Sequence, residues 1–110
     1  MHVIGDVKDK VCLLVDDIID SGGTLCNAAG ALKENGAKEA HAYVVHGVLS
    51  GQAVERIEKS SLKSLVLTNS IVATDIVKTS KKIEQLTIAP LIGEAIRCIT
   101  EEKSISALFR

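Results

Sequence analysis

The chain has 110 residues, 46% of them hydrophobic, and a formal net charge of -1, which favours one folded domain over residues 1–110 rather than a disordered chain. One Tyr, one Phe and no Trp leave few rings for base stacking, and no basic face is visible, so we expect no nucleic-acid partner. No stretch approaches the roughly 20 apolar residues of a membrane-spanning helix, so we expect no membrane partner.

The first half of the chain alternates strand and helix patterns. A charged turn separates a short lead-in strand, Val3 to Val7, from the unbroken apolar run Val11 to Val15, which is typical of a buried strand. Leu25 to Leu32 carries apolar residues at helical spacing. Thr24 is a candidate N-cap for this helix, and Asn35-Gly36 is a good C-terminal stop.

The second half continues this alternation. Ala40 to His46 predicts the second core strand, and Ser50 to Lys59 predicts a helix capped by its first residue. Leu65 to Thr68 and Leu86 to Ala89 predict the third and fourth strands. Between them lies an irregular stretch, 69–82, and irregular stretches of this length often carry function.

The last predicted helix has Pro90 in its first turn, as proline prefers. Its inward face would consist of four apolar residues, namely Ile92, Ala95, Ile96 and Ile99. The segment Ser104 to Phe109 is apolar enough to dock. The alternation of strands and helices predicts an α/β fold in three layers, a mostly parallel sheet of about four or five strands with helices on both faces.

Cys12, Cys26 and Cys98 are odd in number and lack the spacing of a metal site. The segment from His2 to Asp9 is polar and mixed in charge, unlike a secretory signal peptide. We therefore expect reduced thiols, a cytoplasmic location and no metal site formed by this chain alone.

The segment VDDIIDSGGTL, residues 15–25, is the most informative motif. It combines carboxylates, hydroxyls and a glycine pair, namely Asp16, Asp17, Asp20, Ser21, Thr24, Gly22 and Gly23. A strand, then an acidic glycine-rich turn, then the start of a helix form a binding site suited to a phosphorylated polyol. Backbone N–H groups at a helix N-terminus hold phosphate, glycines let it approach, and carboxylates accept hydrogen bonds from sugar hydroxyls or bind Mg²⁺.

Other interpretations of this motif are weaker. Asp-Ser-Gly-Gly is also ordinary turn chemistry, but the strand before it and the helix after it favour a site. Phospho-receiver domains also begin with LLVDD, yet they need a later strand that ends in a carboxylate, and the strand at Leu65 ends in Thr68-Asn69. The GK[ST] of a P-loop and the GxGxxG of a dinucleotide fold are absent.

The motif closely resembles the phosphoribosyl pyrophosphate signature of type I phosphoribosyltransferases. The flanking blocks are similar to one branch of that superfamily, ribose-phosphate pyrophosphokinase (phosphoribosyl pyrophosphate synthetase). These blocks are HVIGDVKDK, HGVLSGQAVERI, LTNSI and APLIGEAIRCITEEKSISALF. The resemblance covers essentially the whole chain, but only the carboxy-terminal part of that enzyme, and it implies a phosphoribosyltransferase-like fold.

This resemblance implies transfer of the diphosphoryl group of Mg-ATP to the 1-hydroxyl of ribose 5-phosphate, which yields phosphoribosyl pyrophosphate and AMP. Asp16 and Asp17 would lie at the ribose, with Asp16 in contact with its hydroxyls. The segment Asp20 to Thr24, including Ser21, Gly22 and Gly23, would hold the 5-phosphate. His46 matches a family block, although a structural histidine at this strand end is the simpler interpretation.

The resemblance also implies a homo-oligomer with a regulatory site between subunits for phosphate or ADP. Ser104 and Ser106 match its hydroxyl positions. In the family, the catalytic basic loop and most of the ATP and Mg²⁺ site lie in the amino-terminal part. We therefore expect no catalytic residue here, with ATP and Mg²⁺ binding in the full enzyme.

The sequence around the motif shows no Lys or Arg to stabilise phosphoryl transfer. We therefore expect this chain alone to bind ribose 5-phosphate without making phosphoribosyl pyrophosphate. Two alternatives stay open: a non-catalytic subunit that docks on a full-length enzyme, and a nucleobase phosphoribosyltransferase. An apolar surface left uncovered would favour dimerisation.

Overall fold

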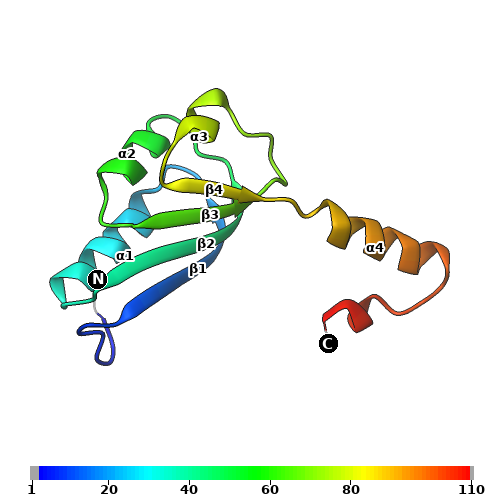
Figure 1. Cartoon of the computed structure of the whole chain (residues 1–110), viewed down its shortest axis with the longest axis horizontal. Helices are drawn as coiled ribbons and strands as arrows, with labels where there is room; N and C mark the ends of the chain where they lie inside the picture. The colour runs from blue at the N-terminus through cyan, green and yellow to red at the C-terminus, as the bar shows by residue number, and fades with distance from the viewer. Residues whose placement is uncertain (1–2, 110) are drawn as a thin grey trace.

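The computed structural model describes residues 3–109 and alternates strands with helices (Figure 1). Its strands are β1 (Val11–Ile19), β2 (Glu39–Gly47), β3 (Ser64–Thr68) and β4 (Ile83–Leu86). Its helices are α1 (Gly23–Glu34), α2 (Ala53–Lys59), α3 (Asp75–Thr79), α4 (Ala89–Thr100) and the 3₁₀ helix η1 (Ile105–Phe109).

The four strands form one sheet in the order β1-β2-β3-β4, and every neighbouring pair is parallel. Parallel neighbours need a crossover, and α1, α2 and α3 supply one between each successive pair. All strands therefore end at the same edge of the sheet. The expected parallel α/β sheet is confirmed.

The core lies between one face of this sheet and the helices. Ala42, Leu65 and Ile83 are register partners across β2, β3 and β4, and all three are buried on that face. Leu25 of α1, Ile57 of α2 and Val77 of α3 belong to the same apolar cluster. Three helices therefore cover one side of the sheet.

The second helix layer that we expected is not formed by the described residues. Side chains that alternate with the core positions of β1 and β2 are exposed, and Val15 is 80% exposed. The exposed set is Val11, Leu13, Val15, Tyr43 and Val45, here called the open face. This arrangement corrects the three-layer prediction to two layers.

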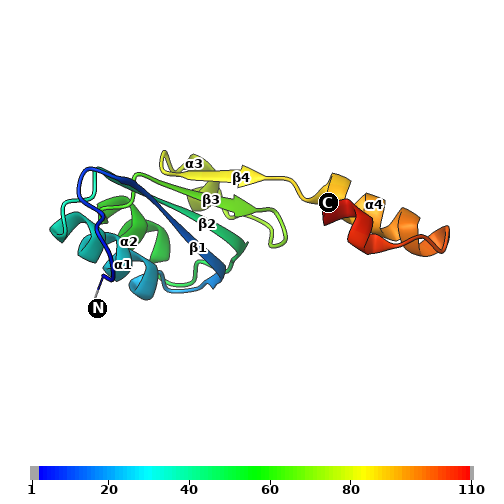
Figure 2. The same cartoon turned by 90° about the horizontal axis from the view of Figure 1, so that it is seen from below.

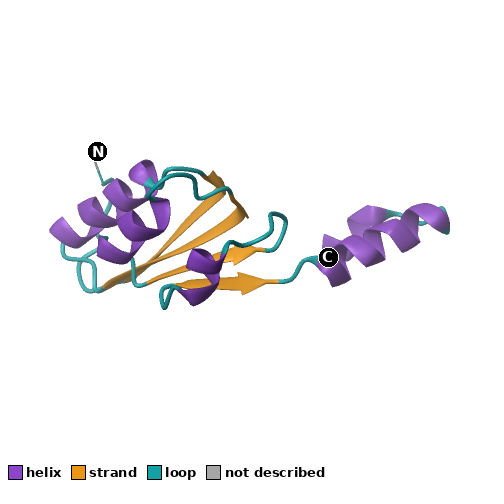
Figure 3. Ribbon diagram, turned by 90° about the horizontal axis from the view of Figure 1, so that it is seen from above, coloured by secondary structure: helices purple, strands orange, loops and turns teal. Residues whose placement is uncertain are grey.

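Helix α4 is the reason for this difference. It runs away from the sheet and packs with η1, as the agreeing views of Figures 1, 2 and 3 show. Its predicted inward face is exposed, with Ile96 at 59% and Ile99 at 65%. Pro90 does lie in the first turn, as predicted.

Several element boundaries differ from the predicted ones. Residues 3–7 form no strand and pair with no strand of the sheet, and the Asp6 carboxylate accepts the Lys8 N–H at 3.0 Å just before a turn. The fourth strand begins at Ile83 rather than Leu86, since Ile83 pairs with Leu65 over the core. The Asn35-Gly36 stop is confirmed, with Gly36 at a φ of 87°.

Candidate functional site

The acidic glycine motif joins β1 to α1 at the edge where the strands end. The strand is longer than expected and includes Asp16 and Asp17, because Asp16 pairs in register with Val44 and Ile19 with Gly47. The turn itself is therefore only Asp20 to Gly22. In parallel α/β sheets this edge is where ligands bind.

The two adjacent aspartates occupy different surroundings. Asp16 lines a cavity of about 240 Å³, together with residues 18–25. Asp17 does not line it, since successive side chains of a strand point to opposite faces. The Asp16 Oδ1 atom also accepts the backbone N–H of Asp17 at 2.8 Å. All predicted sugar-phosphate residues except Asp17 thus surround one cavity.

The start of α1 presents free donors to this cavity. Gly22, with a φ of 82°, is the N-cap, and its carbonyl accepts the first helical N–H, that of Cys26, at 3.0 Å. Within residues 3–109, no acceptor pairs with the backbone N–H groups of residues 22–25. Thr24 lies inside the helix, so its predicted role as N-cap is wrong.

The turn is braced from the segment after β2. Ser50 donates its hydroxyl to the Asp20 carboxylate and its N–H to the Asp20 carbonyl, the latter at 3.1 Å. Val48 N–H adds a bond of 2.9 Å to the Ile19 carbonyl. Ser50 therefore holds the turn rather than capping α2, whose N-cap is Gln52.

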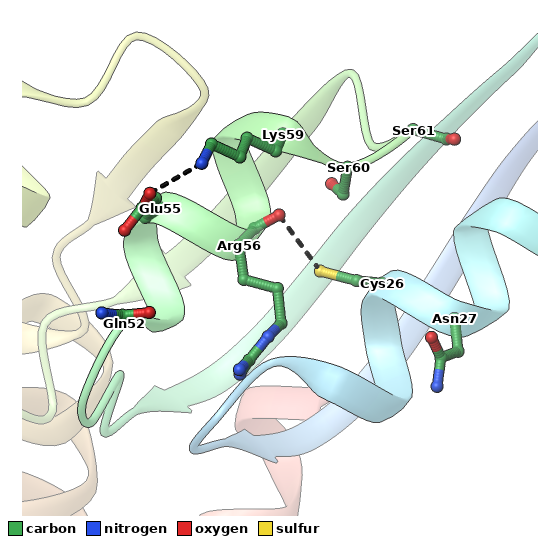
Figure 4. A pocket seen from close by; sticks show the side chains of 8 residues that line it. All are labelled: Cys26, Asn27, Gln52, Glu55, Arg56, Lys59, Ser60 and Ser61. Carbon is green, nitrogen blue, oxygen red and sulfur yellow. Dashed lines mark hydrogen bonds and ion pairs between the residues drawn. The ribbon is translucent and has the colours of Figure 1, made fainter.

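A cation that sequence reasoning missed also reaches the turn. The Arg56 guanidinium of α2 donates to the Ser21 carbonyl. Figure 4 shows this side chain directed from α2 toward the turn before α1, along a second cavity of about 530 Å³ between the two helices. No Lys or Arg lies near the motif along the chain, as expected, but the fold brings Arg56 to the turn.

Other polar residues at this edge bond to one another. His46 Nδ1 lies 2.7 Å from Ser70 Oγ, so a structural role for His46 has direct support. Asn69 bonds Thr87 Oγ1 at 3.2 Å and accepts the Ile88 N–H at 2.9 Å. These contacts link the end of β2 to the loop after β3, and that loop to the segment after β4.

The two predicted regulatory serines lie apart from the motif. Ser104 and Ser106 are exposed, and their Oγ atoms are 2.7 Å apart. Both belong to the segment around η1, which lies beyond α4 and away from the sheet (Figure 1). The structure brings these hydroxyls to each other but not to the sugar-phosphate residues.

The acidic residues of the described chain do not form a ready magnesium site. No group of three or more His, Cys, Asp or Glu side chains in residues 3–109 gathers at metal-binding distance. Asp20 is engaged by Ser50, and Asp16 accepts a backbone N–H.

The cysteines and the helices of the described residues bear on two expectations, reduced thiols and no membrane span. Cys12, Cys26 and Cys98 are free thiols, as expected. Among the helices of residues 3–109, none has the length and apolarity to cross a bilayer.

Comparison with known proteins places the chain in a family. The family model described as "phosphoribosyl synthetase-associated domain" matches residues 1–110. The chain belongs to this family. Among curated relatives, the ribose-phosphate pyrophosphokinase of Granulibacter bethesdensis is 56% identical over 109 residues, covering 99% of this chain and 35% of that protein. The ribose-phosphate pyrophosphokinase of Caulobacter vibrioides (strain NA1000 / CB15N) is 58% identical over the same coverage.

A solved structure agrees with these relatives. Phosphoribosylpyrophosphate synthetase from Mycobacterium smegmatis superposes with a TM-score of 0.85 at 39% identity, covering 90% of this chain and 33% of that one. The predicted ribose-phosphate pyrophosphokinase family is thereby confirmed. This family member spans about 35% of the length of the curated relatives that it matches.

Proposed function

We propose that this chain is the part of a ribose-phosphate diphosphokinase that binds ribose 5-phosphate and phosphoribosyl pyrophosphate. It corresponds to the carboxy-terminal part of that cytoplasmic enzyme, in which ATP and Mg²⁺ are bound mainly by the amino-terminal part. The segment Asp20 to Thr24 holds the 5-phosphate, and Asp16 and Asp17 lie at the ribose, with Asp16 in contact with its hydroxyls.

The set of free backbone donors at the start of α1 carries this proposal. Four successive N–H groups, those of residues 22–25, have no acceptor among the described residues, and these four residues line the cavity that Asp16 also lines. Helix dipole and amide hydrogens together favour an anion at this position. The Ser21 and Thr24 hydroxyls add two further donors.

The same cavity supports binding rather than phosphoryl transfer. No Lys or Arg side chain is among the described residues that line it. Transfer of a diphosphoryl group needs cations around the developing charge. We therefore expect the 110-residue chain alone to release no AMP from ATP and ribose 5-phosphate. Measurable AMP release by the purified chain would contradict this expectation.

A second candidate function has its own support in the open face. An exposed apolar sheet surface suits docking, either on a full-length enzyme as a non-catalytic subunit or within a homo-oligomer. In the oligomer, Ser104 and Ser106 would contribute to a regulatory site for phosphate or ADP. Sedimentation of the chain with and without a full-length relative separates these arrangements.

Calorimetric titration with ribose 5-phosphate, with and without Mg²⁺, tests the proposed function. Asp20→Ala removes the acceptor of the Ser50 hydroxyl, so we expect roughly ten-fold weaker binding, the effect of losing one hydrogen bond that holds the turn. Asp20→Asn is the matched control, because its amide oxygen still accepts that hydroxyl, and we expect affinity within about two-fold of wild type. Absence of binding by the wild-type chain would refute the proposal.

A further inference from the structure

We propose that Arg56 is a positioning residue for the phosphate-binding turn. It holds the Ser21 carbonyl and so directs the Gly22 N–H toward the bound anion. This inference rests on the proposed function, and it adds a residue that lies 35 positions from its contact.

Peptide geometry links the Arg56 contact to the Gly22 N–H. The Ser21–Gly22 bond is trans, because the described chain contains no cis peptide. In a trans peptide the carbonyl oxygen and the next N–H point in opposite directions. The Ser21 carbonyl faces the Arg56 guanidinium, so the Gly22 N–H points away from it. Fixing one end of this peptide plane therefore fixes the other.

The two cavities beside this peptide agree with that geometry. Arg56 lines the cavity between α1 and α2, which Figure 4 shows, and does not line the motif cavity. Gly22 and Gly23 line the motif cavity and not the other one. The turn thus separates the guanidinium on one side from the N–H donors on the other.

The guanidinium is available for this task. No carboxylate of residues 3–109 forms an ion pair with Arg56. Its neighbour Lys59, one turn later on α2, pairs with Glu55 at 2.7 Å instead. A hydrogen bond from a charged donor is stronger than a neutral one, so the Ser21 carbonyl is held firmly.

The placement of α2 does not depend on this side chain. Ala53, Val54 and Ile57 anchor the helix in the core and are at most 7% exposed. Removing the guanidinium should therefore leave the helix in place and free only the turn. A substitution at Arg56 can report on positioning rather than on folding.

The test compares wild type with Arg56→Met, Arg56→Lys and Lys59→Met. Titration uses ribose 5-phosphate and, separately, inorganic phosphate. Amide spectra follow the Gly22 resonance, and thermal unfolding checks the fold. We expect Arg56→Met to bind about ten-fold more weakly, as for loss of one charged hydrogen bond, with a displaced ligand-free Gly22 resonance. Arg56→Lys should restore part of the affinity, since a cationic donor remains.

Lys59→Met is the matched control, because it removes a cation from the same helix without touching the turn. We expect it to keep wild-type affinity and the wild-type Gly22 resonance. If Arg56→Met binds as wild type does, the role of Arg56 is overturned while the proposed function stands. If wild type binds neither ligand, both are overturned. If Arg56→Met does not fold, Arg56→Lys decides: unchanged affinity and Gly22 resonance overturn the inference.

Discussion

Gly22 combines a left-handed backbone with the start of α1. Its φ is 82°, and an added Cβ would lie no closer than 3.7 Å to Ile57 Cγ1, so backbone conformation rather than space requires glycine here. Gly22→Ala should lower the free energy of unfolding by about 1 kcal/mol and weaken phosphate binding, because the turn must relax. Urea unfolding and phosphate titration measure the two effects.

Gly30 provides the matched control within the same helix. It has no close neighbour and no positive φ, so Gly30→Ala should stabilise α1 by roughly 0.5–1 kcal/mol and leave phosphate binding unchanged. Equal effects of the two substitutions on phosphate affinity would contradict the role assigned to Gly22.

Gly47, at the end of β2, is required by space. A Cβ there would lie 2.6 Å from Leu67 Cδ1, and Leu67 is only 1% exposed and cannot move aside freely. Gly47→Ala should therefore destabilise the fold by about 1–3 kcal/mol through overpacking. Leu67→Ala in the same chain should remove this strain, and a double-mutant cycle by chemical unfolding measures the coupling. Additive effects of the two substitutions would argue against a clash.

The beginning of β2 carries a pH-sensitive cluster. The Glu39 carboxylate contacts His41 Nε2 at 3.0 Å and Lys63 Nζ at 3.4 Å. The hydrogen bond with His41 and, after it, the contact with Lys63 lower the pKa of the Glu39 carboxyl from its ordinary value of 4.5. A lowered folded-state pKa gives stability that is present above the unfolded value and lost as pH falls through the folded value. We expect Glu39→Gln to lose less stability than wild type below about pH 4.5, as urea unfolding at several pH values would show. Identical acid profiles would count against the cluster.

Elements with continuous apolar runs were predictable, because burial against helices demands such runs. The segments around Val11, Ala40 and Leu65 are all strands. The prediction was incomplete where pairing overrides composition: β1 continues through its two aspartates because β2 offers partners as far as Gly47. Helix α3 was missed, since it has only five residues and depends on Thr74 accepting the Val77 N–H at 3.4 Å.

The candidate site also has a part that the sequence predicted and a part that it did not. Its turn is continuous in sequence, so a strand, two glycines and a helix pattern were enough to locate it. Ser50 and Arg56 lie 30 and 35 residues from their contacts with Asp20 and Ser21. No local signal distinguished them from an ordinary cap and a surface cation, because only the parallel pairing of β2 with β1 brings α2, which follows β2, beside the turn.

The whole chain has one face of its sheet covered by helices and one open. The open face carries exposed apolar side chains on β1 and β2, a larger continuous set than isolated surface residues explain. We expect concentration-dependent self-association, which Val15→Glu should reduce by placing a charge in the patch. Val72→Glu is the control, since this residue is 88% exposed in a loop outside the sheet. Sedimentation velocity distinguishes these variants, and a strictly monomeric wild type would contradict the expectation.

The binding of a sugar phosphate at the start of α1 is the central claim for the molecule as a whole. A crystal structure of the wild-type chain with ribose 5-phosphate tests it most directly. We expect the 5-phosphate oxygens within hydrogen-bond distance of the N–H groups of residues 22–25, with the ribose hydroxyls toward Asp16. A ligand bound elsewhere, with those N–H groups turned into the protein, would contradict the account.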